Sequence, residues 1–292
     1  MNDRKRQVIT VAKELFVKKG VITTSVQDII NEAKISKGTF YNYFPSKSAC
    51  LIAILEQGNN ETSLRRREIL SGQDPSDKRV LAKQISIHLL VHREHNLIPI
   101  FQAIYYSDDQ DLKAAVKRYQ FEELAWLTGR LVDVYGKESI ASAPDCAVML
   151  YGIIQHLMHI RRNWSKKPFV ANDIIDFAIR RTDAMMSDMI QMNDTFLEPD
   201  IFVKTPKSKK HYTKSELISQ MKTFISSMKG QAAPENNQLI QFMIDEIQVE
   251  SPRIPIIESV NRSFREMYLH TKFEHEAKEL SAKIWAYIDT LK

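Results

Sequence analysis

Residues 36–47 read SKGTFYNYFPSK, and this stretch predicts a short helix with a defined start and end. Ser36 can cap the start, because a serine oxygen accepts hydrogen bonds from the free amides of a helix's first turn. Pro45 ends the helix, and a new helix begins after it. Phe40 and Phe44 are four residues apart and therefore share one face.

The other faces of this helix carry residues that are unusual for a solubilising surface, which commonly holds Glu, Lys and Gln. A small residue beside a lysine and a threonine at a helix start can approach base edges, while tyrosine hydroxyls and a further lysine can hold phosphates. An amphipathic turn with exposed tyrosines is the plainer alternative, and the preceding residues argue against it. The residues on these faces are Lys37, Gly38, Thr39, Tyr41, Asn42 and Tyr43.

Two further helices are expected before this stretch. An apolar stripe predicts the first over residues 3–19, and Gly20 ends it where a left-handed residue is favoured. The second begins after Thr24 or Ser25, either of which can cap it. Two short helices joined by a tight turn, the second of them exposed, form a helix-turn-helix pattern, and the first helix supplies the third wall of a small core. The stripe consists of Val8, Ala12, Leu15 and Phe16, and the capping-box partner is Gln27 or Asp28.

Residues 8–55 resemble the N-terminal domain of bacterial regulators of the TetR/AcrR family. The chain departs from the family pattern at Lys34, where the turn usually has glycine. The resemblance covers only the start of the chain, and it implies a DNA-binding domain followed by an all-helical ligand-binding and dimerisation domain. It rests on the helix end Phe16…Gly20, on TSVQDII at 24–30, and on SKGTFYNYF at 36–44 through to Lys47.

The resemblance also implies roles for individual residues. Family members touch bases with the start of the second helix, grip the DNA backbone with its remainder, and meet a phosphate at the start of the helix before it. Helix starts attract phosphates, so the physical expectation is the same. The bases are assigned to Lys37, Gly38 and Thr39, the backbone to Tyr41, Asn42, Tyr43 and Lys47, and the helix-start phosphate to Thr24 or Ser25; Ser36 completes the candidate DNA-binding set.

Charge supports a nucleic-acid partner for this end of the chain. Residues 1–47 carry nine Lys and Arg against four Asp and Glu, a net charge of +5. The whole chain is also +5, from 41 basic and 36 acidic residues, so the remainder is balanced. A neutral body with one basic end indicates that this end meets a polyanion, although a solvated charged terminus is the simpler alternative.

Other function classes find less support. The two cysteines, Cys50 and Cys146, argue against a disulfide scaffold and fit a reducing cytoplasm. No signal peptide and no run of ~18 apolar residues is present, so we expect a cytoplasmic protein without a membrane partner. No GxSxG elbow, phosphate-binding glycine loop, HExxH or CxxC occurs, so we expect neither enzyme activity nor a cofactor.

The rest of the chain predicts helices with short joints. A helix over 47–70 links the first domain to the next, and Gly58 weakens its middle. Residues 72–75 form a clear break. The domain boundaries that we expect are 1–46 for DNA binding, 47–195 for ligand binding and dimerisation, and 196–292 for a linker and helical extension. The expected helices of the middle domain are 76–94, 96–106, 109–136, 145–164 and 171–192.

Aromatic and histidine residues crowd the middle domain. Most aromatics are ordinary core, but some are candidates to line an apolar effector cavity within residues 80–165. Three histidines at helical spacing could bind a divalent metal, although buried structural histidines are the commoner outcome and no other ligand set supports a metal. The effector candidates are Phe101, Tyr105, Trp126 and Tyr151, and the weak metal candidates are His88, His92 and His95.

The extension needs a partner for its apolar surface. Residues 196–212 contain two prolines and four lysines and predict a linker, followed by helices over 213–229, 235–249 and 254–291. A narrow apolar stripe on the last helix must be buried, either on the same subunit or on a partner subunit. We expect it to enlarge the middle domain's core or the dimer contact. The stripe consists of Phe273, Ala277, Leu280, Ile284, Ile288 and Leu291.

Together these patterns predict a DNA-binding transcriptional regulator, in particular a repressor released by a small molecule of unknown identity. One recognition helix reads few base pairs, so we expect a homodimer on an inverted-repeat operator of double-stranded DNA. The alternative is a metal-responsive regulator of the same fold. The expected dimer helices are 145–164 and 171–192, with Met149, Ile153, Leu157, Ile175, Met186 and Met189 as interface candidates.

Overall fold

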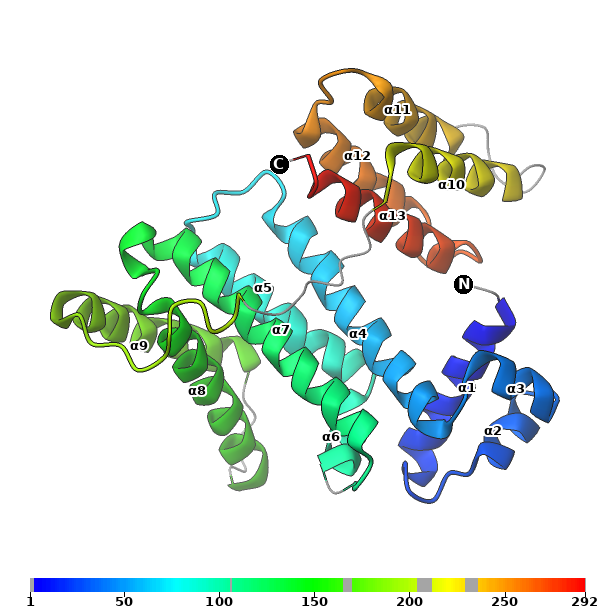
Figure 1. The fold of residues 1–292 in the computed structure, drawn as a ribbon, viewed down its shortest axis with the longest axis horizontal. Coiled ribbons are helices and arrows are strands. Elements are labelled where there is room, and N and C mark those ends of the chain that lie inside the picture. Colours follow the sequence, from blue (N-terminus) through cyan, green and yellow to red (C-terminus); the bar gives the residue numbers. More distant parts are fainter. Residues whose placement is uncertain (1–2, 106, 165–169, 204–211, 229–235, 292) are drawn as a thin grey trace. The chain divides into compact units, whose positions relative to one another are not determined.

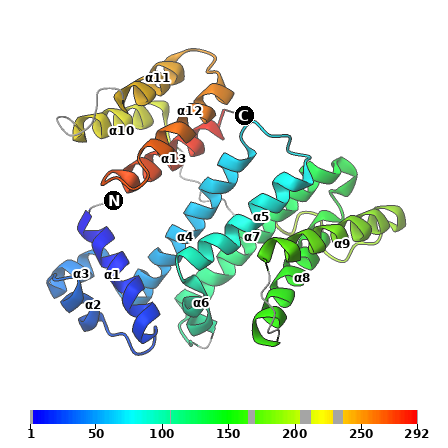
Figure 2. The same ribbon diagram turned by 180° about the vertical axis from the view of Figure 1, so that it is seen from behind.

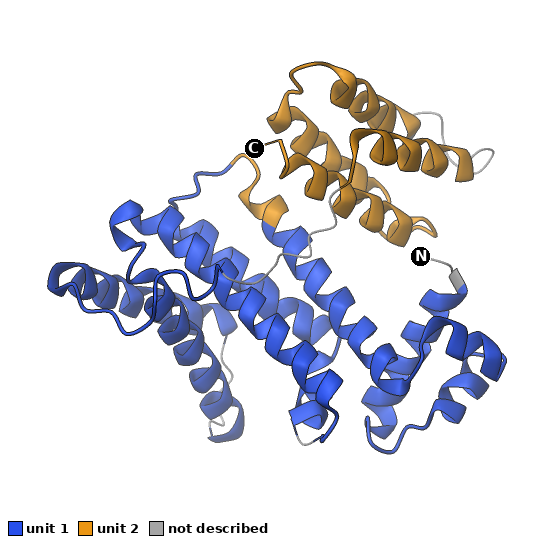
Figure 3. Cartoon of the chain, in the orientation of Figure 1, with its two compact units in different colours: residues 1–66, 73–205 blue, residues 67–72, 206–292 orange. Residues whose placement is uncertain are grey.

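The computed structural model describes residues 3–105, 107–164, 170–203, 212–228 and 236–291, and every regular element in these ranges is helical. The expected all-helical fold is therefore confirmed. The chain divides into two compact units, which Figure 3 shows in different colours. The first unit comprises residues 1–66 and 73–205, and the second comprises residues 67–72 and 206–292.

The chain begins with a bundle of three helices, α1 (Asp3–Lys19), α2 (Val26–Glu32) and α3 (Lys37–Tyr43) (Figure 1). Ser25 caps α2: its hydroxyl accepts from the Asp28 amide at 3.1 Å, and the Asp28 carboxylate accepts from the Ser25 amide at 2.8 Å. The capping box therefore uses Ser25 and Asp28. Lys34 has a φ of +52°, so this turn takes the left-handed conformation with a lysine where the family usually has glycine.

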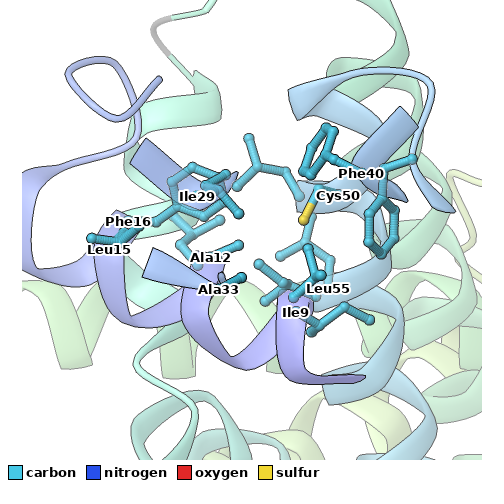
Figure 4. Close-up of a cluster of buried hydrophobic side chains, with 14 of the residues drawn as sticks. Ile9, Ala12, Leu15, Phe16, Ile29, Ala33, Phe40, Cys50 and Leu55 are labelled. Atoms are coloured by element: carbon cyan, nitrogen blue, oxygen red, sulfur yellow. The ribbon is translucent and has the colours of Figure 1, made fainter. Parts of the chain in front are cut away.

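One hydrophobic cluster holds the bundle together (Figure 4). Phe16, Ile29 and Phe40, one from each of the three helices, are completely buried in it. Cys50 and Leu55 of α4 (Lys47–Leu70) close the cluster on another side. The short α3 is thus fixed by the packing around Phe40 rather than by its own length.

Helix α4 is continuous past Gly58, where the sequence suggested a weak point. Leu97 of α6 (Leu97–Tyr105) approaches this glycine so closely that a Cβ there would lie 2.6 Å from Leu97 Cδ1. Leu97, Ile100 and Ile104 are buried in the same cluster as the first three helices. Gly58 therefore permits a close contact between α4 and the helix that touches the N-terminal bundle.

The remaining helices of the first unit surround a second hydrophobic cluster that includes Leu81, Leu131, Leu150 and Ile175. Their ends agree with the predicted spans to within two residues, and a 3₁₀ turn at Lys137–Ser139 is the addition. Figure 2 shows the same helices from behind. These helices are α5 (Lys78–Glu94), α7 (Gln110–Tyr135), α8 (Ala143–Trp164) and α9 (Ala171–Met192).

Part of the predicted linker belongs to the first unit. The Asp145 carboxylate in α8 accepts hydrogen bonds from the amides of Phe196 at 3.0 Å and Leu197 at 3.2 Å. The Phe202 ring lies 5.4 Å from the Phe121 ring of α7. Residues 196–203 are therefore held against α7 and α8, while residues 204–211 of that linker lie outside the described ranges.

The second unit contains α10 (Lys214–Ser227), α11 (Asn236–Gln248), α12 (Ile254–Met267) and α13 (Glu274–Ile288). The prediction of one helix over 254–291 is wrong, because the chain breaks after Tyr268 and His270 takes a φ of +60°. The Glu274 carboxylate accepts from the His270 amide at 2.8 Å, which satisfies the backbone at the break.

The part of the predicted apolar stripe that lies on α13 is buried inside the second unit, whereas Leu291, beyond the helix, is exposed. Ala277, Ile284 and Ile288 are completely buried, in contact with α10 and α12. Charged pairs attach the last turn of α4 to the same unit: Arg265 Nε lies 2.5 Å from the Glu68 carboxylate, and Arg67 lies 2.7 Å from Asp289. None of the helices in the described ranges combines the length and apolarity that a membrane span requires.

Candidate nucleic-acid interface

The outer face of α3 is exposed and free of acidic residues. Lys37, Gly38 and Asn42 are exposed, and Tyr41 is 45% exposed. The opposite face is buried through Phe40, whose ring contacts Tyr41 edge-on at 5.5 Å. The helix therefore presents a fixed row of donors and one bare position to the outside.

The start of α3 is held by Ser36. Its Oγ accepts from the Thr39 amide at 3.1 Å and lies 2.9 Å from the Thr39 hydroxyl. The hydroxyl of Thr39 is thus already oriented within the helix, and its side chain is half-buried. Of the three residues assigned to bases, Lys37 and Gly38 are the more accessible.

Gly38 has no structural requirement for being glycine. A Cβ added there would meet only Ser36 Oγ, at an ordinary 3.8 Å, and φ at Gly38 is not positive. Glycine inside a helix is destabilising by about 1 kcal/mol relative to alanine. Gly38 therefore leaves the start of α3 open to close approach from outside the chain.

At the start of α2, Thr24 and Ser25, which the sequence left as alternative caps, have different surroundings. Thr24 is completely buried, and its hydroxyl donates to the Gly20 carbonyl at 2.7 Å, so in this conformation the hydroxyl is committed to the fold. Ser25 is exposed and is the N-cap. Hydrogen bonds from Ser25, together with Lys19 at 3.0 Å, hold the pKa of Asp28 far below its usual range. The carboxylate therefore stays ionised beside Ser25 and weakens the attraction of this helix start for a phosphate.

Lys47 is placed differently from an ordinary surface lysine. Its ammonium donates to the carbonyls of Val21 at 2.9 Å and Thr24 at 3.0 Å, which ties the loop before α2 to the start of α4. A lysine ammonium has three N–H donors, so one remains for a phosphate. Lys47 therefore positions α2, and a DNA contact would be its second role.

Two contacts at this end of the chain were not anticipated from the sequence. The Lys5 ammonium lies 5.1 Å from the centre of the Phe44 ring, just beyond α3. Tyr43 is half-buried and packs on the hydrophobic cluster, so only part of its ring is free for the DNA backbone. The 39-residue separation of Lys5 and Phe44 carries no local signal that a sequence pattern could reveal.

Comparison with known proteins agrees with this geometry. Residues 8–54 match the family described as bacterial regulatory proteins, tetR family. The N-terminal domain belongs to the TetR family. Its relatives are transcriptional regulators, a non-enzymatic family, so α2 and α3 are the helix-turn-helix of a DNA-binding transcriptional regulator.

Individual relatives differ in how much of the chain they share. The chain is 25% identical to YuxN, an uncharacterized HTH-type transcriptional regulator of Bacillus subtilis, over 99% of this chain and 98% of YuxN. It is 27% identical to YerO, another such regulator of the same organism, over 89% of each chain. The HTH-type transcriptional regulator EthR of Mycobacterium tuberculosis is 32% identical over 26% of this chain and 34% of EthR. No solved structure matches.

In this regulator the four predicted effector aromatics lie in different surroundings. Tyr105 is 80% exposed. Trp126 stacks under the Arg66 guanidinium, with 3.4 Å between the guanidinium carbon and the ring centre. Phe101 stacks on His92 with ring centres 5.1 Å apart. Burial raises the pKa of Tyr151 to about 12. Three of the four aromatics thus surround a buried polar cluster, and the fourth faces outward.

An ion pair forms the centre of that cluster. The Arg66 guanidinium donates two hydrogen bonds to the Glu123 carboxylate, at 2.6 and 2.7 Å, and a third to the Gln84 carbonyl at 3.0 Å. Burial alone would raise the pKa of Glu123, but the charge and hydrogen bonds of Arg66 outweigh it and hold the pKa at about 2. The pair is fully satisfied and requires no ligand.

The three histidines do not form a metal site. The His88 and His92 rings lie 4.0 Å apart between centres, whereas His95 Nδ1 lies 3.5 Å from the Lys13 ammonium of α1. Within the described ranges no group of three or more His, Cys, Asp or Glu side chains is arranged to hold a metal ion. Burial, mainly, lowers the pKa of His92 to about 3, so this imidazole is neutral at physiological pH.

Proposed function

We propose that this regulator binds an inverted-repeat operator as a homodimer and represses transcription until a small molecule releases it. The observation that carries DNA recognition is the outer face of α3, where Lys37, Gly38, Tyr41 and Asn42 are exposed on a helix fixed by Phe40. A bare glycine beside a lysine allows close approach to base edges, and the tyrosine and asparagine suit phosphates. Because the proposed target is DNA, a cytoplasmic location is part of the same proposal.

The proposed dimer uses the outer faces of α8 and α9. Ile175 and Met186 are buried in their own cluster and are poor interface candidates. Val148, Ile160 and Phe177 are exposed apolar side chains on these two helices and take their place. Apolar residues in water on neighbouring helices are typical of a surface that associates. Of the other predicted candidates, Met149, Ile153, Leu157 and Met189 remain, because each is half-buried.

The proposed domain roles follow from this arrangement. Residues 1–46 bind DNA, residues 47–195 hold the effector and the dimer surface, and residues 196–292 form the extension. The contact of α6 with both α4 and the N-terminal cluster is the route by which an effector would act on α3.

A gel-shift assay with the upstream region of the regulator's own gene tests the proposal. We expect Lys37→Ala to change which sequences bind, and Tyr41→Phe to weaken all sequences alike and lower the salt slope by roughly one. Lys83→Ala, an exposed lysine on α5, is the control and should bind as the wild type does. Operator affinity unchanged in Lys37→Ala and Tyr41→Phe contradicts the assignment of α3.

Ultracentrifugation at micromolar concentration tests the dimer separately. The wild type should sediment as a dimer, and Phe177→Glu should shift it toward the monomer, because a charge would be buried in the contact. A wild-type monomer on its own rules out the proposed assembly.

A further inference from the structure

A cavity of about 470 Å³ opens between the end of α5, the start of α6 and the end of α8. Its size is within the range of pockets that hold small organic ligands. None of the four predicted effector aromatics lines it, although His92, which stacks on Phe101, does.

The walls of the cavity are positive. Arg93 and Arg162 both line it, and no Asp or Glu does. Glu94 is adjacent in sequence to Arg93 but pairs with Arg65 at 2.8 Å. Within the part of the chain that the structure describes, neither Arg93 nor Arg162 has an ion-pair partner. Two unpaired guanidinium groups facing one space attract an anion, and a guanidinium suits the planar oxygens of a carboxylate or phosphate.

The remaining lining suits an organic ligand rather than a bare inorganic ion. Ile98 and Pro99 form an apolar wall from the first turn of α6, and Gln102 supplies an amide on the same helix. His92 lines the cavity as a neutral imidazole, because burial keeps its pKa near 3. The cavity therefore has a positively charged end and an apolar end.

Occupation of this cavity would act on α6 directly. Ile98 and Gln102 face the cavity, while Leu97, Ile100 and Ile104 of the same helix are buried in the cluster that contains α1 to α4. Leu97 also lies against Gly58 of α4 with no space for another atom. A ligand that moves α6 therefore moves side chains in the core of the DNA-binding bundle.

We propose that this cavity binds a small organic anion, with a carboxylate or phosphate head group on Arg93 and Arg162 and an apolar part on Ile98 and Pro99. This inference rests on the proposed function in one respect: the anion is the effector that changes DNA affinity. Arginines in the last turns of α5 and α8 also interact favourably with the helix dipoles, and that role alone would need no ligand.

Calorimetric titration of the full chain with benzoate, phenyl phosphate and neutral benzamide separates these roles without DNA. We expect benzoate or phenyl phosphate to bind at least about tenfold more tightly than benzamide, and the better anion identifies the head group. Arg93→Gln and Arg162→Gln should each weaken the anion about tenfold. Lys83→Gln removes the same charge from an exposed position on α5 and should leave binding unchanged.

The proposal is overturned if both anions bind no tighter than about 1 mM, if benzamide binds equally, or if the double variant Arg93→Gln, Arg162→Gln retains wild-type affinity. Unchanged thermal unfolding of the variants verifies that they are folded. In a gel shift, the bound anion should alter operator affinity in the wild type and not in the double variant. Failure of the wild type to bind any operator contradicts the proposed function, while the titration still decides the anion site.

Discussion

Helices α3 and α13 use their surfaces in opposite ways. Helix α3 has seven residues and buries Phe40 alone, whereas α13 has fifteen residues and buries seven of them. The outer face of α3 is polar and includes a glycine that the fold does not need, while the apolar stripe of α13 is covered within its own unit. The proposed recognition surface and the stabilising apolar surface are therefore located in different helices, and substitutions should separate their effects.

The largest expected effect is on the stability of the second unit. Phe264 is completely buried, with its ring 5.3 Å from Tyr268 and 5.5 Å from Phe224. Phe264→Ala should lower the free energy of unfolding by about 3–5 kcal/mol, because it leaves a cavity. Hydrogen exchange of α10–α13 should accelerate, and operator affinity should stay at the wild-type value. Wild-type protection of these helices would show that the packing of Phe264 is not what stabilises them.

A smaller loss is expected where a polar residue of the DNA-binding bundle serves the fold. Lys47→Met leaves the carbonyls of Val21 and Thr24 without their donor and should lower the free energy of unfolding by about 1–3 kcal/mol. Lys37→Met removes the same charge from an exposed site and should change the free energy of unfolding by less than about 0.5 kcal/mol. Urea denaturation measures the free energy of unfolding of both variants. Equal losses would mean that Lys47 does not stabilise the fold more than the exposed Lys37 does.

The helices of the first unit that follow α4 bury polar groups, and the stability of this part of the chain should depend on pH. The pKa of His92 is lowered mainly by burial from about 6.5 to about 3, so the unfolded chain binds more protons between these values. The free energy of unfolding is therefore unaffected by His92 well above pH 6.5 and decreases as the pH falls below this value. At pH 5.5 the decrease due to His92 is about 1.4 kcal/mol. Glu123 contributes little here, because its stabilisation disappears only below its unfolded value of 4.5.

Urea denaturation of the wild type and His92→Phe at pH 8 and pH 5.5 measures this effect. The phenyl ring can keep the stacking on Phe101, so the variant should lose about 1.4 kcal/mol less than the wild type on acidification. An identical pH dependence in both proteins would mean that His92 titrates normally.

The smallest effect on stability, and the sharpest test of α3, concerns Gly38. Gly38→Ala should raise the free energy of unfolding by up to about 1 kcal/mol, because alanine is the better helix former and its Cβ has space. Operator affinity should nevertheless fall at least about tenfold, equivalent to about 1.4 kcal/mol. A variant that is more stable and binds the operator with wild-type affinity would contradict the proposed close approach of DNA to Gly38.

Helix ends were predictable from the sequence wherever a local signal marks them. Ser36 predicts the start of α3 and Pro45 predicts its end, and both boundaries are observed. The break between α12 and α13 was missed, because the apolar stripe continues across it without Pro or Gly. His270 adopts the left-handed conformation there, supported by Glu274 four residues on.

The candidate site was less predictable, because its details depend on contacts between distant residues. Residue type alone makes Thr24 and Ser25 equivalent caps, and only the approach of the Gly20 and Leu15 carbonyls assigns Thr24 to the interior. The positioning role of Lys47 likewise depends on a carbonyl 26 residues away. Residue type also indicated that the aromatics of the middle domain would lie in the core or line a cavity. It did not indicate which side of each helix faces a cavity.

The division of α4 between two units has a consequence for biosynthesis. Residues 67–72 belong to the second unit, but their partners begin after residue 205, so 133 residues must be made in between. At roughly 5–20 residues per second, the last turn of α4 leaves the ribosome roughly 7–27 s before residue 206 follows. During that interval Arg67 and Glu68 lack Asp289 and Arg265. The helix that carries the DNA-binding bundle is therefore completed last at its far end, when translation of the chain finishes.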